Sequence, residues 1–259
     1  MKFRVYPLLQ PLSRENGRRC YNDSGQSALH LVEPSELRWL GDGYPLKARV
    51  AHRPVPGYGK MKPEETGSHY DRIALSWQKR LMDSSYGVAA LERAIKFVEN
   101  KAAALDVGCG SSGRFIDVLL KNGFTASGVD ISAEMISLAR QRHPDATFYV
   151  EDICTWRLPQ EYDLISAWDS TFHLPLAEQE PVLKKMCEGL SPKGVVLFTC
   201  GGTAEAGEIS GSFDGETFDY STLGVNEFLR LLIEFSCTCR HVEFDQYPEN
   251  HVVIIAQKP

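Results

Sequence analysis

Apolar and polar positions along the chain follow two different periods from about residue 66 onward. Where apolar residues recur every three or four positions, the pattern predicts amphipathic helices, and these segments are 69–81, 84–100, 114–123, 133–143, 178–190 and 225–235. Short apolar runs bounded by turn-forming residues predict buried strands, and these runs are 103–107, 124–130, 147–152, 162–169, 194–199, 238–244 and 251–256.

This alternation predicts an α/β fold with a doubly wound, Rossmann-like sheet. Strands that alternate with helices form a mostly parallel sheet, because right-handed crossovers lay the helices on both of its faces. The last two strands are joined by residues 245–250 alone. That connection is too short for a helical crossover, so the last pair of strands is predicted to be antiparallel.

The segment 201–220 interrupts the pattern with glycines and carboxylates. It is too long for a plain connector, so we expect a loop that acts as a lid or shapes the site of a second substrate. Its carboxylates favour a cationic or amine substrate.

The first 60 residues differ from the rest of the chain. They contain six of the 14 prolines and ten Lys and Arg against five Asp and Glu, with no sustained period. We therefore predict a basic, proline-rich extension over residues 1–60, to which the sequence assigns no role, and one domain over residues 61–259. The whole chain has a net charge of −6, to which the extension contributes +5, so residues 61–259 carry −11.

Composition narrows the classes of partner. An acidic domain argues against nucleic acid, which needs clustered cations to displace counterions. No apolar run reaches the roughly 18 residues of a membrane span, so we expect no membrane association. The seven cysteines are scattered, as reduced thiols in a cytoplasmic protein would be. Cys237 and Cys239 have no histidine or second cysteine pair at zinc-site spacing, so we expect no metal.

The stretch AALDVGCGSSGRF carries the main chemical signal. The predicted strand 103–107 has Asp106 near its end, and glycines follow at 108, 110 and 113 before a predicted helix. In a doubly wound sheet this arrangement lets a ligand approach the backbone at the carboxyl edge of the first strand. Asp130 ends the next strand, 20 residues after Gly110, where its carboxylate can accept hydrogen bonds from ribose hydroxyls.

Asp106 decides which nucleoside fits. A carboxylate at this strand tip would repel a pyrophosphate in a crevice of low dielectric constant but would attract an amine or a sulfonium. S-adenosylmethionine has both cations and an adenosine. Asp152, at the end of the third strand, can accept a hydrogen bond from the adenine amine, while Ile131 and Ile153 sandwich the ring.

With LDVGCG, GVDIS, VEDI and LISAWD in this order, the chain resembles the class I S-adenosylmethionine-dependent methyltransferases from about Tyr70 to Lys258. The resemblance implies a seven-stranded sheet in the order 3-2-1-4-5-7-6, with the last strand antiparallel and S-adenosylmethionine across strands one to four. An aromatic residue of the helix before the sheet, Tyr70 or Trp77, would cover the cofactor. The implied cofactor-binding residues are Tyr70, Asp106, Gly108, Cys109, Gly110, Asp130, Ile131, Met135, Asp152 and Ile153.

Methyl transfer to a nitrogen, oxygen or sulfur atom of a small-molecule acceptor is the predicted activity. The protein mainly has to align the acceptor, the methyl group and the sulfur atom, and a base matters only when the acceptor atom carries a proton. Asp169 and His173 follow the fourth strand, and His251 opens the last one, so these three residues are the catalytic candidates. The strand-four motif AWDS differs from the Asn/Asp-Pro-Pro-aromatic type used on nucleobase amines, and no basic aromatic track for RNA is present.

Two other functions stay open at this point. A regulator could bind S-adenosylmethionine without catalysis. A nicotinamide-dependent reductase shares the three glycines and Asp130, but Asp106 opposes it, and the chain's only Tyr-x-x-x-Lys, from Tyr58 to Lys62, precedes the nucleotide motif. The sequence leaves the acceptor and the oligomeric state undetermined.

Overall fold

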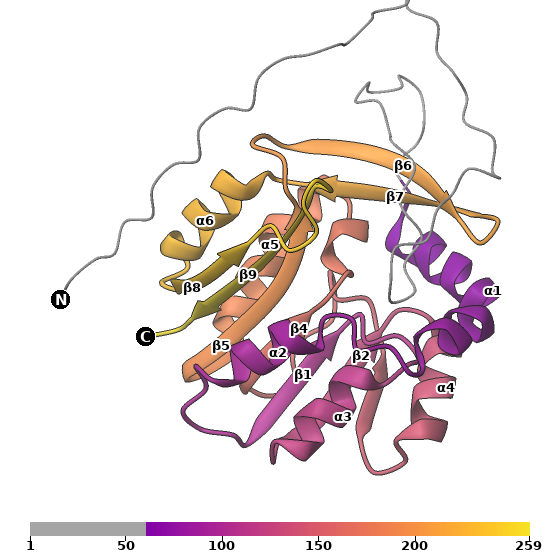
Figure 1. Cartoon of the computed structure of the whole chain (residues 1–259), viewed down its shortest axis with the longest axis horizontal. Helices are drawn as coiled ribbons and strands as arrows, with labels where there is room; N and C mark the ends of the chain where they lie inside the picture. The colour runs from indigo at the N-terminus through magenta and orange to yellow at the C-terminus, as the bar shows by residue number, and fades with distance from the viewer. Residues whose placement is uncertain (1–60) are drawn as a thin grey trace, which may run out of the picture. The chain divides into compact units, whose positions relative to one another are not determined.

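The computed structural model describes residues 61–259, so the predicted extension over residues 1–60 lies outside the described residues. A seven-stranded sheet forms the centre, in the order β3-β2-β1-β4-β5-β9-β8 (Figure 1). Its strands are β1 (Ala103–Val107), β2 (Thr125–Asp130), β3 (Thr147–Val150), β4 (Tyr162–Ala167), β5 (Leu190–Gly201), β8 (Thr238–Glu243) and β9 (His251–Gln257). This is the predicted order once a separate hairpin is left out of the count.

Helices cover both faces of the sheet, as the alternation predicts. They are α1 (Pro63–Leu81), α2 (Val88–Ile95), α3 (Arg114–Lys121), α4 (Ala133–Arg142), α5 (Leu176–Glu188) and α6 (Val225–Glu234), with a short 3₁₀ helix η2 (Thr171–His173). Successive residues of β5 point to opposite faces. Val196 and Phe198 pack in the core cluster that includes residues of α5 and α6, whereas Val195 and Leu197 pack with residues of α2, α3 and α4.

The last two strands are antiparallel, which confirms the prediction from their short connection. β9 runs antiparallel to β5 on one side, with Phe198 opposite Ile254, and to β8 on the other, with Val242 opposite the same residue. The parallel pairs β1–β2, β2–β3, β1–β4 and β4–β5 make up the rest of the sheet. Because β9 is inverted, its first residue, His251, lies at the carboxyl edge of the parallel strands.

The segment predicted as a loop over 201–220 is largely a β-hairpin, β6 (Gly207–Phe213) and β7 (Glu216–Thr222), so that prediction was wrong in its local structure. The turn residues Asp214 and Gly215 have φ values of 54° and 84°. A two-residue turn with both φ values positive matches the twist of a hairpin, and Asp-Gly is a strong signal for it. Alternation in EISGSF and ETFDYS points to the same structure.

Two helices differ in length from the pattern. α1 begins at Pro63, six residues before the periodic segment, because the Lys62 amide donates to Glu65 Oε2 at 2.9 Å in a capping box. A proline in the first turn also suits a helix start, since its missing N–H has no partner there in any case. α2 ends at Ile95, although Val98 is still buried. The helical spacing of apolar residues therefore continues to the buried Val98, although the backbone is no longer an α-helix there.

Candidate functional site

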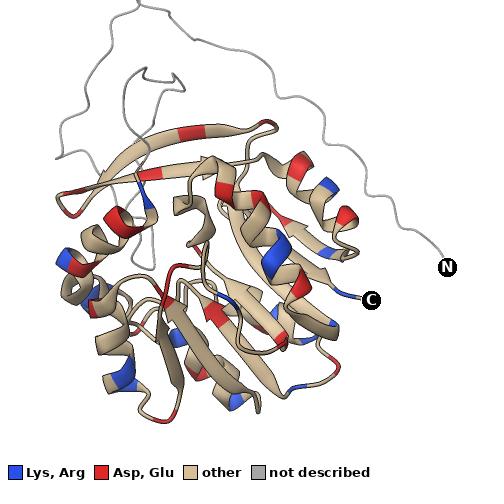
Figure 2. Cartoon of the chain, turned by 180° about the vertical axis from the view of Figure 1, so that it is seen from behind, with Lys and Arg blue, Asp and Glu red and all other residues tan. Residues whose placement is uncertain are grey.

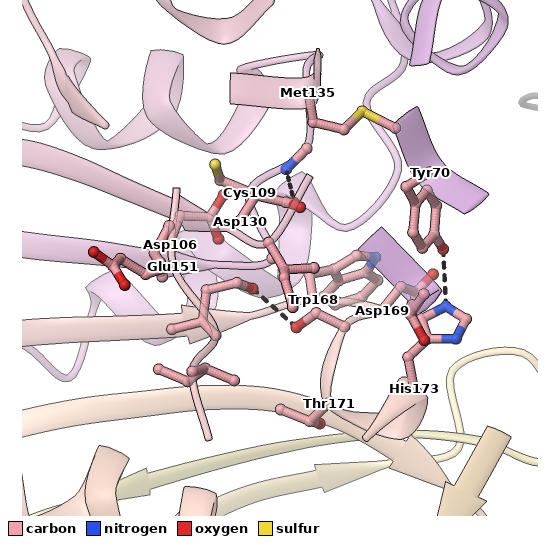
Figure 3. A pocket seen from close by; sticks show the side chains of 18 of the residues that line it. Tyr70, Asp106, Cys109, Asp130, Met135, Glu151, Trp168, Asp169, Thr171 and His173 are labelled. Carbon is pink, nitrogen blue, oxygen red and sulfur yellow. Dashed lines mark hydrogen bonds between the residues drawn. The ribbon is translucent and has the colours of Figure 1, made fainter. Parts of the chain in front are cut away.

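A cavity opens at the carboxyl edge of β1, β2 and β4, and α1 supplies part of its wall. All ten residues that the sequence predicts for cofactor binding line it, and Trp77, Asp169 and His173 do so as well. Residues that the prediction missed also line it, including Ser112, Arg114, Glu151, Trp168, Ser170 and Thr171. In the view of Figure 3, Asp106 and Asp130 lie on one side of the cavity and Tyr70 and His173 on the other.

The glycine loop forms the floor beside β1. Gly108 has a φ of 67°, and a Cβ there would lie 2.2 Å from Ser170 Cβ, so only glycine fits. Gly110 has a φ of 57°, and a Cβ there would meet only Trp77 Nε1, at 3.6 Å, on the cavity side. The Gly110 amide donates to Asp130 Oδ2 at 2.9 Å. The glycine loop therefore exposes its backbone to the cavity next to Asp130, the last residue of β2.

Asp106 is a buried carboxylate at the tip of β1. Its side chain is 5% exposed, and Ser166 Oγ donates to its Oδ1 at 2.7 Å. Burial raises the pKa of Asp106 to about 7, although the Ser166 hydrogen bond and the Arg114 charge both act to lower it. A cationic ligand group at this position would favour the charged form. Asp106 would therefore be charged once a cation lies beside it.

Asp130 is held by two backbone amides. Ser132 N donates to its Oδ1, and Gly110 N donates to its Oδ2, both at 2.9 Å. Burial raises the pKa of Asp130, and these two amides oppose that rise. A carboxylate oxygen accepts more than one hydrogen bond, so each oxygen keeps capacity for a ligand.

The loop after β3 forms another wall of the cavity. Asp152 Oδ1 accepts from Cys154 N at 2.9 Å, and the side chain of Ile153 is packed against the core. Lys185 on α5 holds this loop from behind, since its Nζ donates to the carbonyl oxygens of Ile153, Cys154 and Trp156 at 2.6, 3.0 and 2.8 Å. An ammonium has three N–H donors, and these carbonyls use all of them. Ile131 and Met135 line the cavity beside this loop.

Tyr70 and His173 form a hydrogen-bonded pair on one side of the cavity. Tyr70 Oη lies 2.8 Å from His173 Nε2, and His173 Nδ1 lies 3.1 Å from the carbonyl oxygen of Asp219 (Figure 3). A carbonyl oxygen only accepts, so Nδ1 carries the ring hydrogen of the neutral imidazole. Nε2 then accepts the hydroxyl proton of Tyr70. Phe218 and Tyr220 pack on the pair, with centroid distances of 4.7 Å to Tyr70 and 4.8 Å to His173.

Asp169 and His251 belong to a second polar cluster beside the cavity. His251 Nε2 lies 2.8 Å from Asp169 Oδ1, and its Nδ1 lies 2.6 Å from Asp245 Oδ1. Tyr86 Oη donates to Asp169 Oδ2 at 3.1 Å, and Thr199 Oγ1 donates to Asp169 Oδ1 at 3.2 Å. Burial lowers the pKa of His251, but the two carboxylates outweigh it and raise the pKa to about 9. Asp169 lines the cavity, whereas His251 is not among its lining residues.

The hairpin is fastened to α1 by charged pairs. Arg72 donates from Nε and Nη2 to the two carboxylate oxygens of Glu216, both at 2.7 Å, and Arg80 Nη2 donates to Asp214 Oδ1 at 2.6 Å. Figure 2 shows acidic positions at the hairpin end near α1 and basic positions along α1. Asp214 and Glu216 thus face arginines of α1, and no carboxylate of residues 201–220 lines the cavity, so these carboxylates give no reason to expect a cationic acceptor.

The model of the family described as "Methyltransferase domain" matches residues 104–194, which run from β1 into β5 and include the glycine loop, Asp130 and Asp152. Residues 104–194 thus match a methyltransferase domain, and the sheet has the fold of S-adenosylmethionine-dependent methyltransferases. Outside the match lie α1, with Tyr70, and the hairpin that packs on it.

Relatives of the methyltransferase domain include a phosphoethanolamine N-methyltransferase of Plasmodium falciparum, 29% identical over 45% of this chain and 46% of that protein. A dTDP-3-amino-3,6-dideoxy-alpha-D-glucopyranose N,N-dimethyltransferase of Streptomyces fradiae is 30% identical over 55% of this chain and 61% of the relative. The chain thus spans about half the length of the curated relatives that it matches.

Solved structures share the fold of the methyltransferase domain at low identity. An S-adenosylmethionine-dependent methyltransferase from Clostridium acetobutylicum has a TM-score of 0.57 at 14% identity, covering 73% of this chain and 98% of that one. The glycopeptide N-methyltransferase MtfA, complexed with S-adenosyl-L-homocysteine, has a TM-score of 0.55 at 14% identity, over 74% and 98%. Within residues 61–259, none of the helices combines the length and the apolar composition needed to span a membrane.

Proposed function

We propose that the protein transfers the methyl group of S-adenosylmethionine to the amine or hydroxyl group of a small molecule. The observation that carries this proposal is the composition of one cavity. A buried carboxylate suited to a cation, Asp106, lies on one side, and a hydrogen-bonded pair able to move a proton, Tyr70 with His173, lies on the other. We assign the activity to residues 61–259.

The residues of the cavity fit the cofactor portion by portion. Asp106 and the backbone of the glycine loop would hold the methionine portion, whose ammonium and the nearby sulfonium are both cationic. Asp130 would accept hydrogen bonds from the ribose hydroxyls through the capacity that its two backbone amides leave. Asp152 would accept from the adenine amine, with Ile131, Met135 and Ile153 against the ring.

Bound in this way, S-adenosylmethionine supplies a methyl group on a good leaving group, so the protein has little bond-breaking chemistry to catalyse. The work of the chain is to align the acceptor, to exclude water and to accept a proton. Tyr70 Oη, whose hydrogen points to His173 Nε2, would accept a hydrogen bond from the acceptor group through its oxygen. As the acceptor atom loses its proton, Tyr70 Oη takes it and passes its own proton to Nε2.

His173 is suited to receive that proton. Its Nδ1–H is tied to the Asp219 carbonyl, which fixes the ring and stabilises a positive charge on it. Asp169 contributes a fixed charge nearby, and His251 would act only through Asp169, as a positioning residue. These roles apply to acceptors that carry a proton on the attacking atom, namely amines and hydroxyls. Relatives named as N-methyltransferases support the amine class.

The test is a mass-spectrometric screen. Wild-type protein is incubated with a metabolite extract and S-adenosylmethionine that carries a deuterated methyl group, and products that gain the label are identified. With the acceptor found, Tyr70→Phe and His173→Gln are each expected to lower kcat by roughly 100-fold, a typical share of general base catalysis. Their affinity for S-adenosylmethionine should change little. His241→Gln, outside the cavity on β8, is the matched control and should keep full activity.

The same screen separates the alternatives. Binding of S-adenosylmethionine with no labelled product from any extract would indicate the regulator without catalysis. Binding of a nicotinamide dinucleotide in place of S-adenosylmethionine would indicate the reductase. Full activity of both Tyr70→Phe and His173→Gln would retain the methyltransferase but remove the proposed proton path.

A further inference from the structure

The charged residues that line the cavity are mostly carboxylates. The carboxylates among them are Asp106, Asp130, Glu151, Asp152 and Asp169. Within the described part of the chain, Arg114 is the one lysine or arginine on that lining. The methionine portion of S-adenosylmethionine carries a carboxylate as well as an ammonium. A carboxylate buried in a cavity of this composition would be repelled unless a cation paired with it.

Resting on the function proposed above, we propose that Arg114 binds the carboxylate of the methionine portion and makes the site specific for amino-acid-bearing ligands. Arg114 is the first residue of α3, directly after the glycine loop. It therefore lies at the end of the cavity that also contains Asp106. The two side chains would complement the two charged groups of one amino acid, with the carboxylate on Arg114 and the ammonium on Asp106.

The guanidinium is held in a fixed orientation. Its Nε donates to the Tyr86 carbonyl at 2.9 Å, and its Nη1 donates to Ser112 Oγ at 2.9 Å. The Arg114 Cζ atom also lies 5.5 Å from the ring centroid of Phe115. A guanidinium carries more N–H donors than these two hydrogen bonds use. A planar fork that is fixed before the ligand arrives is suited to a carboxylate and loses little side-chain entropy on binding.

A purely structural role for Arg114 would give a different result. The side chain joins the loop before α2 to the glycine loop, so its removal could loosen the site for every ligand alike. The two roles are separated by varying the ligand rather than the protein alone. Decarboxylated S-adenosylmethionine keeps the adenosine, the sulfonium and the amine but lacks the carboxylate.

The experiment is calorimetric titration of wild type, Arg114→Gln and Arg114→Lys with S-adenosylmethionine and with its decarboxylated form. Arg114→Gln is expected to weaken S-adenosylmethionine binding by roughly 10- to 100-fold, the range of a charged hydrogen bond. The same variant should bind the decarboxylated ligand as tightly as wild type or more tightly, because it removes a positive charge facing a dication. Arg114→Lys, which keeps the charge but not the fork, should give an intermediate loss with S-adenosylmethionine.

Arg140→Gln is the matched control, since Arg140 on α4 donates to the Phe148 carbonyl and does not line the cavity. It should leave both affinities unchanged. An equal loss for both ligands in Arg114→Gln, or no loss for either, would overturn the assignment while S-adenosylmethionine binding by wild type still supported the proposed function. If wild type bound neither ligand, the proposed function itself would fail. If Arg114→Gln does not fold by circular dichroism, the comparison of wild type with Arg114→Lys decides.

Discussion

Replacing Asp106 by asparagine should stabilise the unliganded protein and damage its cofactor site. In the folded state, burial raises the pKa of Asp106 from 3.8 to about 7. Between these values the folded state binds more protons than the unfolded state, so the free energy of unfolding falls as the pH rises. A shift of this size corresponds to about 4 kcal/mol, at roughly 1.4 kcal/mol for each pH unit, and the cost is complete above pH 7.

Asparagine removes this cost with little change of shape. Its Oδ1 can still accept the Ser166 hydroxyl proton, which lies on a 2.7 Å hydrogen bond in the wild type. Asp106→Asn should therefore match the wild type near pH 4 and exceed its free energy of unfolding at pH 8 by up to about 4 kcal/mol. Binding of S-adenosylmethionine should move the other way. Wild-type affinity rises with pH through about 7 as Asp106 ionises, and the variant lacks this rise and binds at least about 10-fold more weakly.

Urea unfolding between pH 4 and 8, followed by circular dichroism, and calorimetry over the same range measure both effects. Asp163→Asn is the control, because Asp163 is equally buried but accepts from the amides of Ala102 and Ala103 at 2.9 Å. Removal of that charge should give no gain in stability at pH 8. The reasoning about Asp106 is refuted if Asp106→Asn keeps the wild-type pH dependence of unfolding, or if it binds S-adenosylmethionine as tightly as wild type.

Three further substitutions test other parts of the site. Gly110→Ala and Gly123→Ala both put a side chain at positive φ, at a cost of about 1–2 kcal/mol in stability. Only the Cβ at position 110 enters the cavity, so only Gly110→Ala should abolish S-adenosylmethionine binding by calorimetry. Loss in both, or in neither, would contradict this geometry. Lys185→Met should weaken S-adenosylmethionine binding about 10-fold, because it releases the loop after β3. The control Lys184→Met, at the exposed neighbouring lysine, should leave the affinity unchanged. Equal affinities of the two variants would show that Lys185 does not have this role. The ion pairs of His251 stabilise the fold fully below pH 6.5, and this stabilisation is lost by about pH 9. His251→Gln should therefore remove about 3 kcal/mol of pH-dependent stability in urea unfolding. An unchanged dependence of the unfolding free energy on pH would exclude the charged imidazole.

The sheet could be predicted from the sequence because its signals are local. Buried strands such as 103–107 are short apolar runs, and the six residues between the last two strands allow only an antiparallel pair. The hairpin is harder to predict because its glycines weaken the alternation of the two strands, although Asp214-Gly215 marks its turn. The start of α1 was missed because a capping box, rather than apolar periodicity, sets it.

The candidate site also has a part that the sequence predicts and a part that it does not. The cofactor residues follow strand ends, so topology alone brings Asp106, Asp130 and Asp152 to one edge. The Tyr70–His173 pair joins residues 103 positions apart through the packing of α1 on the hairpin, and no local pattern encodes that contact. The sequence alone does not mark Arg114, because a basic residue after a glycine loop has many structural uses. Only the composition of the whole cavity lining singles it out.

The most direct test of the account is a calorimetric titration of wild type and Asp130→Ala with S-adenosylmethionine and, separately, with NADPH. A cavity built for a cationic nucleoside without phosphates predicts that S-adenosylmethionine binds the wild type at a single site. The same account predicts that Asp130→Ala weakens this binding at least about 10-fold, and that NADPH gives no heat of binding. Tight binding of NADPH, or equal S-adenosylmethionine affinity in the two proteins, would contradict it.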